Sequence, residues 1–303
     1  MVDITYKNTT LRTAVAQAIV KVSSQSTIDA IKNDTVPKGN VFAMSKAAGL
    51  LGVKRTPDIL PDCHPLPIEF TGVEYEINAL EITVLFTVKT IYKTGVEVEA
   101  MHGASIVALN MYDMLKPIDK GIEIHAIKLL NKKGGKSDYK DTFKNDLTAA
   151  VIVCSDTIAA GQKEDKAGKA IIHKLENCHV KISEYTIIPD EKEHIQEKAK
   201  TLASQGLNMV IYTGGTGLSG RDVTPEALLP LLDRRIPGIE EAIRSYGQSR
   251  MLYAMLSRSI AGTIGNTLIL ALPGSTNGAK ESMDAIFPAV LHVFKVLKGI
   301  RHD

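Results

Sequence analysis

The pattern of apolar residues changes near residue 140, and this change constrains the fold more than any other feature of the chain. After residue 140, short apolar runs alternate with stretches of helical spacing. The runs cover residues 149–156, 180–190, 207–217 and 266–275, and the helical stretches cover 165–178, 191–206, 222–233, 237–247 and 280–298. Because such alternation builds parallel sheets covered by helices, it predicts an α/β domain with a doubly wound, mostly parallel sheet.

Before residue 140, strands are grouped around a few helices. Apolar residues alternate at 15–22 and 121–130, and the β-branched stretch 68–91 predicts a hairpin that turns near Asn78. Helices are predicted at 26–33 with Ser26 as the cap, at 41–51 and at 95–116. The apolar residues whose spacing predicts the last of these helices are Val98, Met101, Ile106, Leu109 and Met114. This pattern predicts an α+β domain with an antiparallel sheet.

Length and composition fit two globular domains. The 303 residues are predicted to form domains at 1–140 and 148–303, joined by a short polar linker at 141–147. The net charge of +2 gives no reason to expect a nucleic-acid partner, and no apolar run is long enough for a membrane span. The N-terminus does not resemble a signal peptide, and the three cysteines show no paired spacing. We therefore expect a cytoplasmic protein without a zinc ribbon.

Polar or glycine-rich turns follow the predicted strands of the second half. Ligands of open parallel sheets bind outside the carboxyl ends of the strands, where glycine turns and helix starts hold anions. A single glycine turn is often only a turn, and an aspartate at such a position is often only a helix cap. Several such turns at one edge indicate a phosphate site, with Asp190 and Asp222 as candidate Mg²⁺ ligands. The other candidates are Ser155, Asp156, Asp165, Thr213, Gly214, Gly215, Thr216, Gly217, Pro273, Gly274 and Ser275.

These motifs, in this order, resemble the molybdopterin-binding domain family over Thr148–Gly299, a family that includes molybdopterin adenylyltransferases. The resemblance implies binding of molybdopterin and transfer of AMP from Mg-ATP, with Asp190 and Asp222 as the two important aspartates. The glycine loop falls on Gly214, Gly215 and Gly217, and the Ser-Asp loop on Ser155, Asp156 and Asp165. Ile264 stands where many members have an arginine, which puts one phosphate contact in question. The alternative is a domain that binds molybdopterin without catalysis.

The first half carries lysines, a Cys-His pair and carboxylates. Taken singly, Lys38 before a helix is usually a surface residue, Cys63-His64-Pro is usually a packed turn, and Asp113 with Lys116 could be a surface ion pair. The apolar spacing predicts that Asp113 and Lys116 lie at a core-facing end of their helix. There a lysine beside an acid can be tuned as a general acid.

Over Met1–Asp138 the motifs KGNVFAMSKAAG, KRTPDILPDCHPL and KTGVEVEAMHGASIVALNMYDMLK resemble cyclic pyranopterin monophosphate synthase. The resemblance implies a ferredoxin-like α+β fold, a hexamer of dimers with active sites at dimer interfaces, and no cofactor. It implies that a cyclised GTP intermediate is rearranged to a cyclic pyranopterin phosphate with loss of pyrophosphate. Catalytic residues map to Lys38, His64, Asp113 and Lys116. Pocket residues map to Lys54, Cys63, Glu97, Glu99, Met101, Lys133 and Lys136.

The stretch Lys132–Asp141 is predicted to close the first domain as a basic flap over phosphates. Asp62 replaces the apolar residue that members usually carry before Cys-His-Pro-Leu. Together, the two resemblances predict a bifunctional enzyme of molybdenum-cofactor biosynthesis, assembled as a homo-oligomer (hexamer or trimer). A more remote alternative is an unrelated nucleotide-binding enzyme or scaffold.

Overall fold

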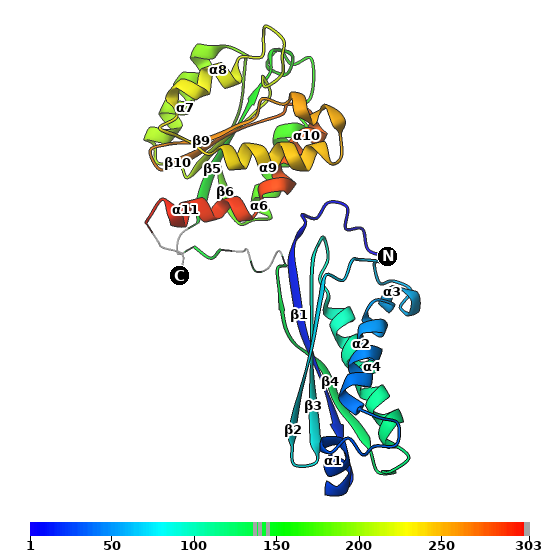
Figure 1. Cartoon of the computed structure of the whole chain (residues 1–303). Helices are drawn as coiled ribbons and strands as arrows, with labels where there is room; N and C mark the ends of the chain where they lie inside the picture. Colours follow the sequence, from blue (N-terminus) through cyan, green and yellow to red (C-terminus); the bar gives the residue numbers. More distant parts are fainter. Residues whose placement is uncertain (136–137, 139–140, 144–145, 300–303) are drawn as a thin grey trace. The chain divides into compact units, whose positions relative to one another are not determined.

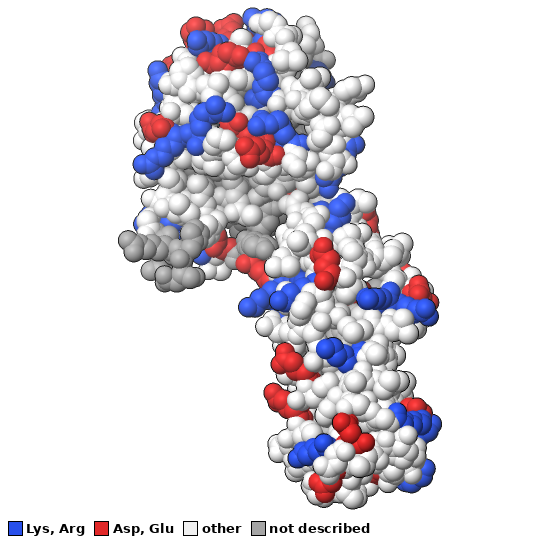
Figure 2. Space-filling model, viewed as in Figure 1, with Lys and Arg blue, Asp and Glu red and all other residues white. Residues whose placement is uncertain are grey.

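The computed structural model describes residues 1–135, 138, 141–143 and 146–299. It divides into two compact units, Met1–Asp138 and Tyr139–Asp303, which are described separately below (Figure 1). No helix in these described ranges is long and apolar enough to cross a membrane. On the face shown in Figure 2, basic and acidic side chains are interspersed over both units. This distribution agrees with the small net charge.

The first unit is one antiparallel sheet with helices on one face (Figure 1). Its strands pair in the order β2-β3-β1-β4. They are β1 (Thr10–Lys21), β2 (Phe70–Asn78), β3 (Glu81–Tyr92) and β4 (Glu123–Lys133), and the helices are α1 (Gln25–Lys32), α2 (Val41–Val53), α3 (Thr56–Ile59) and α4 (Glu97–Leu115). The predicted α+β class and antiparallel sheet are confirmed.

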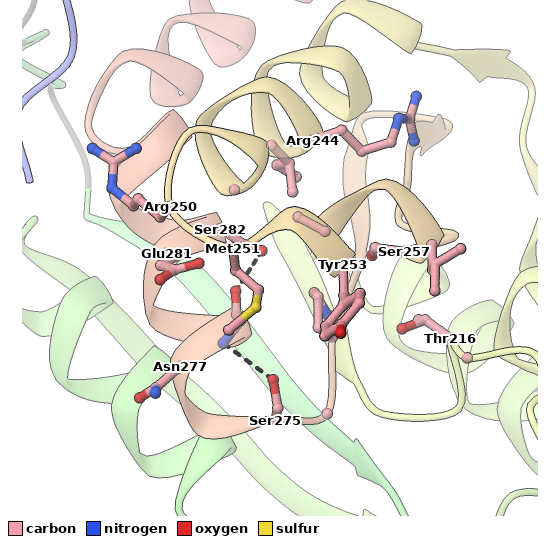
Figure 3. A pocket seen from close by; sticks show the side chains of 18 of the residues that line it. Thr216, Arg244, Arg250, Met251, Tyr253, Ser257, Ser275, Asn277, Glu281 and Ser282 are labelled. Carbon is pink, nitrogen blue, oxygen red and sulfur yellow. Dashed lines mark hydrogen bonds between the residues drawn. The ribbon is translucent and has the colours of Figure 1, made fainter.

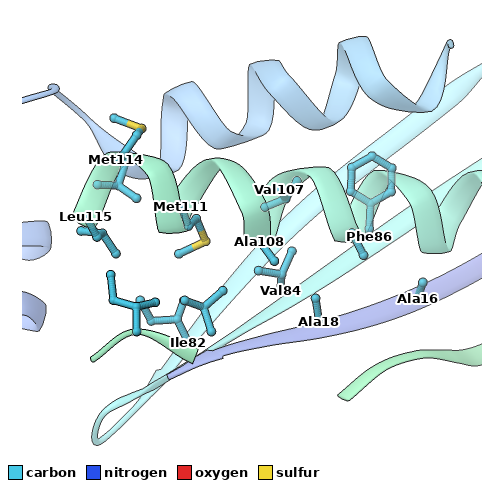
Figure 4. Close-up of a cluster of buried hydrophobic side chains, with 14 of the residues drawn as sticks. Ala16, Ala18, Ile82, Val84, Phe86, Val107, Ala108, Met111, Met114 and Leu115 are labelled. Carbon is cyan, nitrogen blue, oxygen red and sulfur yellow. The ribbon is translucent and has the colours of Figure 1, made fainter. Parts of the chain in front are cut away.

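Alternation along the strands places one set of side chains under the helices (Figure 4). On β1 this set consists of small residues, Ala14, Ala16 and Ala18, all fully buried. Small side chains let α4 approach the sheet, while larger residues of β3 such as Phe86 fill the remaining space. Helices α2 and α4 meet at glycines: a methyl group on Gly49 or Gly103 would overlap neighbouring side chains, including the ring of Phe86.

Three details of the first unit differ from the sequence expectations. The N-cap position of α1 is held by Ser24 and not by Ser26. Val98 and Leu109 of α4, expected on the apolar face, are 46% and 57% exposed. The residues of α4 that face the core include alanines and a glycine, which an apolar count based on large side chains overlooks.

The second unit is a six-stranded sheet in the order β6-β5-β7-β10-β9-β8, with helices on both faces. Its strands are β5 (Leu147–Cys154), β6 (Val180–Ile188), β7 (Met209–Thr213), β8 (Arg234–Arg235), β9 (Ile260–Ile264) and β10 (Thr267–Leu272). The α-helices are α5 (Asp156–Ala159), α6 (Ala167–Glu176), α7 (Lys192–Ser204), α8 (Thr224–Leu228), α9 (Pro237–Gln248), α10 (Thr276–Ile286) and α11 (Val293–Val296). Short 3-10 helices are η2 (Leu229–Leu231), η3 (Leu252–Leu256) and η4 (Ala289–His292).

The mostly parallel character of this sheet is confirmed. Strands β6, β5, β7 and β10 pair in parallel, whereas β9 and β8 are antiparallel additions at one edge that the sequence pattern did not predict. Helices α7 and α8 cover one face and α6, α9 and α10 the other, so the central strands are buried on both sides. The predicted closing helix 280–298 is broken after Ile286, because Pro288 cannot donate a helical hydrogen bond.

We expect Gly103→Ala to destabilise the first unit by about 1–3 kcal/mol, because the added methyl group overlaps Phe86 in a packed core. Urea unfolding of the full chain, followed by circular dichroism, measures the change. Gly238→Ala in α9 is the matched control, because its added methyl group meets no neighbour. Equal unfolding midpoints for wild type and Gly103→Ala would show that α2 and α4 can separate with little loss in the free energy of unfolding.

Candidate active sites

Three predicted catalytic residues of the first unit meet at the C-terminal end of α4. Lys116 Nζ lies 2.7 Å from Asp113 Oδ1, and Lys38 Nζ lies 2.6 Å from Asp113 Oδ2. Lys38 also donates to the backbone carbonyl of Asp113 at 2.8 Å. The turn before α2 supplies Lys38 and the last turn of α4 supplies Asp113, so the packing of the two helices assembles this lysine-bridged aspartate.

The two ammonium groups fix the charge state of the aspartate. Hydrogen bonds from Lys116 and then Lys38 lower the pKa of Asp113 to about 2, and Asp113 in turn raises the pKa of Lys116. The expectation of a shielded, core-facing pair is wrong, since the side chain of Asp113 is half exposed within a single chain. Its neighbours Met114 and Leu115, not Asp113, occupy the core positions.

A second set of predicted residues meets at the other end of α4. The thiol of Cys63 donates to Glu99 Oε1 at 3.1 Å, and Glu99 is only 2% exposed. Burial, followed by the nearby carboxylate, raises the pKa of Cys63 to about 12, so the thiol stays protonated. Burial also raises the pKa of Glu99. His64 Nε2 lies 2.8 Å from the carbonyl oxygen of Val2.

The remaining predicted pocket residues of the first unit lie near this second set or outside the described residues. Glu97 pairs with Lys132 at 3.0 Å, while the neighbouring Lys133 is exposed and stands opposite Thr13 in the sheet. Lys54 is the exposed C-cap of α2, and Met101 is half-buried beside the core. Lys136 lies outside the described residues. Of the predicted flap, Lys132 and Lys133 belong to strand β4, and the N–H of Gly134 donates to Asp138 Oδ2 at 2.6 Å.

Two residues near this end were missed or uncertain from the sequence. Arg12 is 8% exposed, and its guanidinium donates to the carbonyls of Tyr92 and Lys93. An arginine near the start of a strand is usually exposed, so the sequence gives no signal for the burial of Arg12. Asp62 is exposed and accepts a hydrogen bond from the amino group of Met1, which lowers its pKa.

One chain keeps the two sets apart. Glu99 and Asp113 are 14 residues apart on a continuous helix, which corresponds to about 21 Å at 1.5 Å per residue. Helix α2 runs antiparallel to α4, as the contacts of Ser45 with Asn110 and of Gly52 with Ile106 show. The lysine-bridged aspartate and the Cys63–Glu99 set therefore cannot act on the same atoms within one chain.

In the second unit, the predicted loops at the strand ends do meet. Asp156, after β5, and Asp190, after β6, exchange hydrogen bonds: the N–H of Asp190 donates to Asp156 Oδ1 at 3.0 Å, and the N–H of Asp156 donates to Asp190 Oδ2 at 3.2 Å. Ser155 caps the short helix that follows β5. This reciprocal pair fixes both carboxylates at one edge of the sheet.

Of the predicted site residues in the second unit, Asp190 is the one whose surroundings most favour contact with a ligand. Its Oδ1 is buried and is one of two buried side-chain oxygens or nitrogens that lack a hydrogen-bond partner in the described part of the chain. Burial, and then the like charges of Asp156 and Asp222, raise the pKa of Asp190. Burial also acts to raise the pKa of Asp222, but hydrogen bonds from Ser219 and the backbone of Gly217 outweigh it and leave that pKa lowered.

These carboxylates fit a magnesium ion that shares its ligands with a substrate. The described residues contain no group of three or more His, Cys, Asp or Glu side chains that could hold a metal ion. Asp190 and Asp222 would supply at most two protein ligands. Mg²⁺ commonly binds through one or two carboxylates while phosphate oxygens and water complete its shell, so the donor set and the orphaned Asp190 oxygen suit it.

The glycine loop follows β7 and is fixed by close backbone contacts. Gly214 has φ +102°, and a methyl group there would overlap the carbonyl oxygen of Cys154. Gly215 has φ +61° and lies beside Asp190 Oδ1, so a side chain would fill the space there. Arg258, which the sequence search missed, holds this loop by donating to the carbonyls of Gly217 and Asp222.

The turn after β10 joins the same edge. Thr213 donates to the carbonyl of Pro273 at 2.8 Å, and Gly274 lies against the backbone of Gly214. Ser275 caps α10, and Thr216 is 5% exposed beside Gly217. The structure thus brings the predicted turns together, as expected for the carboxyl ends of parallel strands.

Asp165 does not belong with these groups. It is 3% exposed, and its oxygens accept hydrogen bonds from the N–H groups of Gly168 and Lys169 and from the hydroxyl of Tyr185. Its side chain caps α6 through these hydrogen bonds, and its role as a binding residue stays a prediction.

The concern about Ile264 is also resolved by its position. It ends β9 at the turn into β10, whereas the edge formed by the turns after β5, β6, β7 and β10, here named the candidate phosphate edge, follows the other end of β10, about 20 Å away along six residues of strand. A side chain at 264 therefore lies at the wrong end of β10 to contact phosphates held by this chain's own loops.

A cavity of about 660 Å³ opens beside the glycine loop (Figure 3). Thr216 and Gly217 line one side and Ser275 and Asn277 another, and the segment around Tyr253 lines a third. The residues of this segment are largely apolar and exposed: Met251, Leu252, Tyr253, Met255 and Leu256. An open, partly apolar cavity therefore lies next to the glycine loop.

Comparisons with known proteins match both units. Residues 1–135 match the MoaC family, and residues 150–292 match the probable molybdopterin binding domain. A solved structure, the molybdopterin biosynthesis enzyme MoaB from Thermus thermophilus, is 38% identical over 50% of this chain and 97% of its own, with a TM-score of 0.48. Cyclic pyranopterin monophosphate synthase from Clostridium perfringens is 45% identical over 45% of this chain and 87% of its own length.

Fold, sites and matches together define a two-domain enzyme of molybdenum cofactor biosynthesis. The molybdenum cofactor biosynthesis bifunctional protein of Chlorobaculum tepidum is 39% identical over 100% of this chain and 96% of its own length. A protein of the same name from Synechococcus elongatus is 37% identical over 100% of this chain and 98% of its own length. The chain belongs to this family of bifunctional proteins.

We expect the carboxyl group of Asp113 to titrate near pH 2, well below its ordinary value of about 3.9. Because its pKa is lower in the folded state, its contribution to stability is complete above about pH 4 and is lost as the pH falls towards 2. Carbon-detected NMR of the side-chain carboxyl measures the titration. Lys116→Ala should move the midpoint upwards, while Lys120→Ala, on an exposed lysine beyond α4, should not. A wild-type midpoint near 4 would contradict the ion-pair geometry.

Proposed function

We propose that the first unit converts 3′,8-cyclised dihydro-GTP to cyclic pyranopterin monophosphate and pyrophosphate. The observation that carries this proposal is the assembled Lys38–Asp113–Lys116 group in a chain of the bifunctional family. The β-α-β-β-α-β order of the unit supports the ferredoxin-like assignment. Because its substrate derives from a cellular nucleotide, we place the enzyme in the cytoplasm.

The charge states suggest the roles of the three residues. An aspartate with a pKa of about 2 is a weak base near neutral pH, so its main role is to orient two lysine ammonium groups. Lys116 remains protonated and can donate a proton as the substrate ring opens and recloses. Lys38 and the lysines near Glu97 can meet the triphosphate as point charges.

We propose that a complete first-unit site takes residues from two copies of the chain. The lysine-bridged aspartate and the set around Cys63, His64 and Glu99 lie about 21 Å apart in one chain, so a neighbouring copy must bring one set to the other. Large apolar side chains that a partner could cover lie on α2 and α4. They are Met44, Leu51, Val98, Leu109 and Tyr112.

A mixture of two inactive variants tests this shared site. Asp113→Ala and His64→Ala should each abolish formation of the cyclic pyranopterin phosphate. An equimolar mixture whose subunits exchange freely should regain about a quarter of wild-type activity, because about half of the dimers are mixed and one of the two sites in each mixed dimer receives both intact sets. Product is measured after its oxidation to a fluorescent pterin. A mixture as inactive as its components, although native mass spectrometry shows mixed dimers, would place the whole site in one chain.

For the second unit we propose adenylylation of molybdopterin by Mg-ATP. The terminal phosphate oxygen of molybdopterin attacks the α-phosphorus of ATP, a new P–O bond forms, and pyrophosphate leaves. The cavity beside Tyr253 and Ser275 would receive the pterin, and the glycine loop would hold phosphates through its N–H groups. Asp190 and Asp222 would hold Mg²⁺, which supplies charge neutralisation at the phosphates.

The alternative is a second unit that binds molybdopterin without catalysis. The buried, unpaired oxygen of Asp190 supports the enzymatic proposal. A buried oxygen without a hydrogen-bond partner destabilises the fold, and a site that only holds a pterin has no need for it. The carboxylates also lie outside the residues that line the cavity, as expected if a second substrate occupies the candidate phosphate edge.

We expect Asp222→Ala to lower the rate of adenylylation at least about 100-fold, because the phosphates lose a magnesium ligand. The assay follows adenylylated molybdopterin and pyrophosphate together. Glu241→Gln, on an exposed position of α9, is the matched control and should keep full activity. Tight binding of molybdopterin without product in the wild type would establish the carrier alternative.

A further inference from the structure

Arg221 reaches across the candidate phosphate edge from the loop between β7 and α8. Its Nε and Nη2 both donate to Asp156 Oδ2, at 3.0 and 2.7 Å. The side chains of Arg221 and Asp156 are 63% and 42% exposed. The contact therefore joins two surface loops over the site and is not part of a core.

Through Asp156, Arg221 is connected to the orphaned carboxylate. The other oxygen of Asp156 accepts the N–H of Asp190, and the N–H of Asp156 donates back to Asp190. The position of Arg221 is thus coupled to the position of Asp190. Among the described residues at this edge, Asp190 is the carboxylate with a buried oxygen that has no hydrogen-bond partner.

The two arginines described at this edge are held differently. Arg258 is committed to the glycine loop, since it donates to the carbonyls of Gly217 and Asp222 and pairs with Glu226. Arg221 is held by one oxygen of one exposed carboxylate. Exposed ion pairs of this kind add little to stability, so an anion with better geometry can displace Asp156.

We propose that Arg221 is a phosphate-recognising latch, which neutralises Asp156 in the free enzyme and moves to a phosphate oxygen when the nucleotide binds. The proposal rests on adenylyl transfer in the second unit. A guanidinium matches the geometry of phosphate with two parallel hydrogen bonds, whereas here it shares a single carboxylate oxygen. The exchange would release Asp156 and transfer one positive charge to the phosphates.

A double-mutant cycle on the full chain tests the latch. Isothermal titration calorimetry with ATP in the presence of EDTA measures affinity without metal ions. Asp156→Asn should bind ATP about tenfold more tightly, because Arg221 loses its competing partner, and Arg221→Gln should bind about tenfold more weakly. In the double variant the gain from Asp156→Asn should vanish, because it requires Arg221.

Two controls separate this mechanism from others. Asp222→Asn removes a negative charge without releasing Arg221, and its effect on ATP affinity should be the same with and without Arg221→Gln. Thermal unfolding of each variant shows that the surface loops still fold. If Asp156→Asn gains the same affinity in both backgrounds, or if Arg221→Gln binds as the wild type does, the latch is wrong. If the wild type binds no ATP even with Mg²⁺, adenylyl transfer itself fails, and the latch with it.

Discussion

The close contact of α4 with the sheet is the constraint on which the first unit depends. Alanines on β1 and glycines between α2 and α4 bring these elements together, so α4 lies as a straight spacer across the domain. Its length fixes the separation between the lysine-bridged aspartate and the Cys63–Glu99 set. A helix of this length keeps the two sets apart within one chain, which is the physical reason for proposing a shared active site.

The second unit depends on a different constraint, the common direction of its parallel strands. Because β5, β6, β7 and β10 run the same way, their carboxyl ends gather turns that are far apart in sequence. Glycines at positions with positive φ let the backbone pass within contact distance of Cys154 and Asp190. The result is a cluster of three aspartates in which Arg221 pairs with Asp156, while one buried oxygen of Asp190 has no hydrogen-bond partner among the described residues.

The sequence predicted much of both folds and most groupings of site residues. The change of apolar period near residue 140 separated the two fold classes, and the turns predicted at the strand ends do meet at one edge of the second sheet. The differences have physical causes. Alanine and glycine, which carry the α4 contact, contribute little to an apolar pattern. Asp165 follows the same loop as Asp156, but only the backbone geometry shows that it caps α6.

The sequence by itself determined which chemical groups are present and the order of most secondary structure elements, because both follow from residue type and local periodicity. Only the tertiary structure decided which groups meet. It showed that Asp113 holds two lysines at the surface, that Ile264 lies at the wrong end of its strand, and that Arg221 bridges two loops through Asp156. The contacts of Asp113 with Lys38 and of Arg221 with Asp156 join residues 75 and 65 positions apart, and their distances depend on packing that no local pattern encodes.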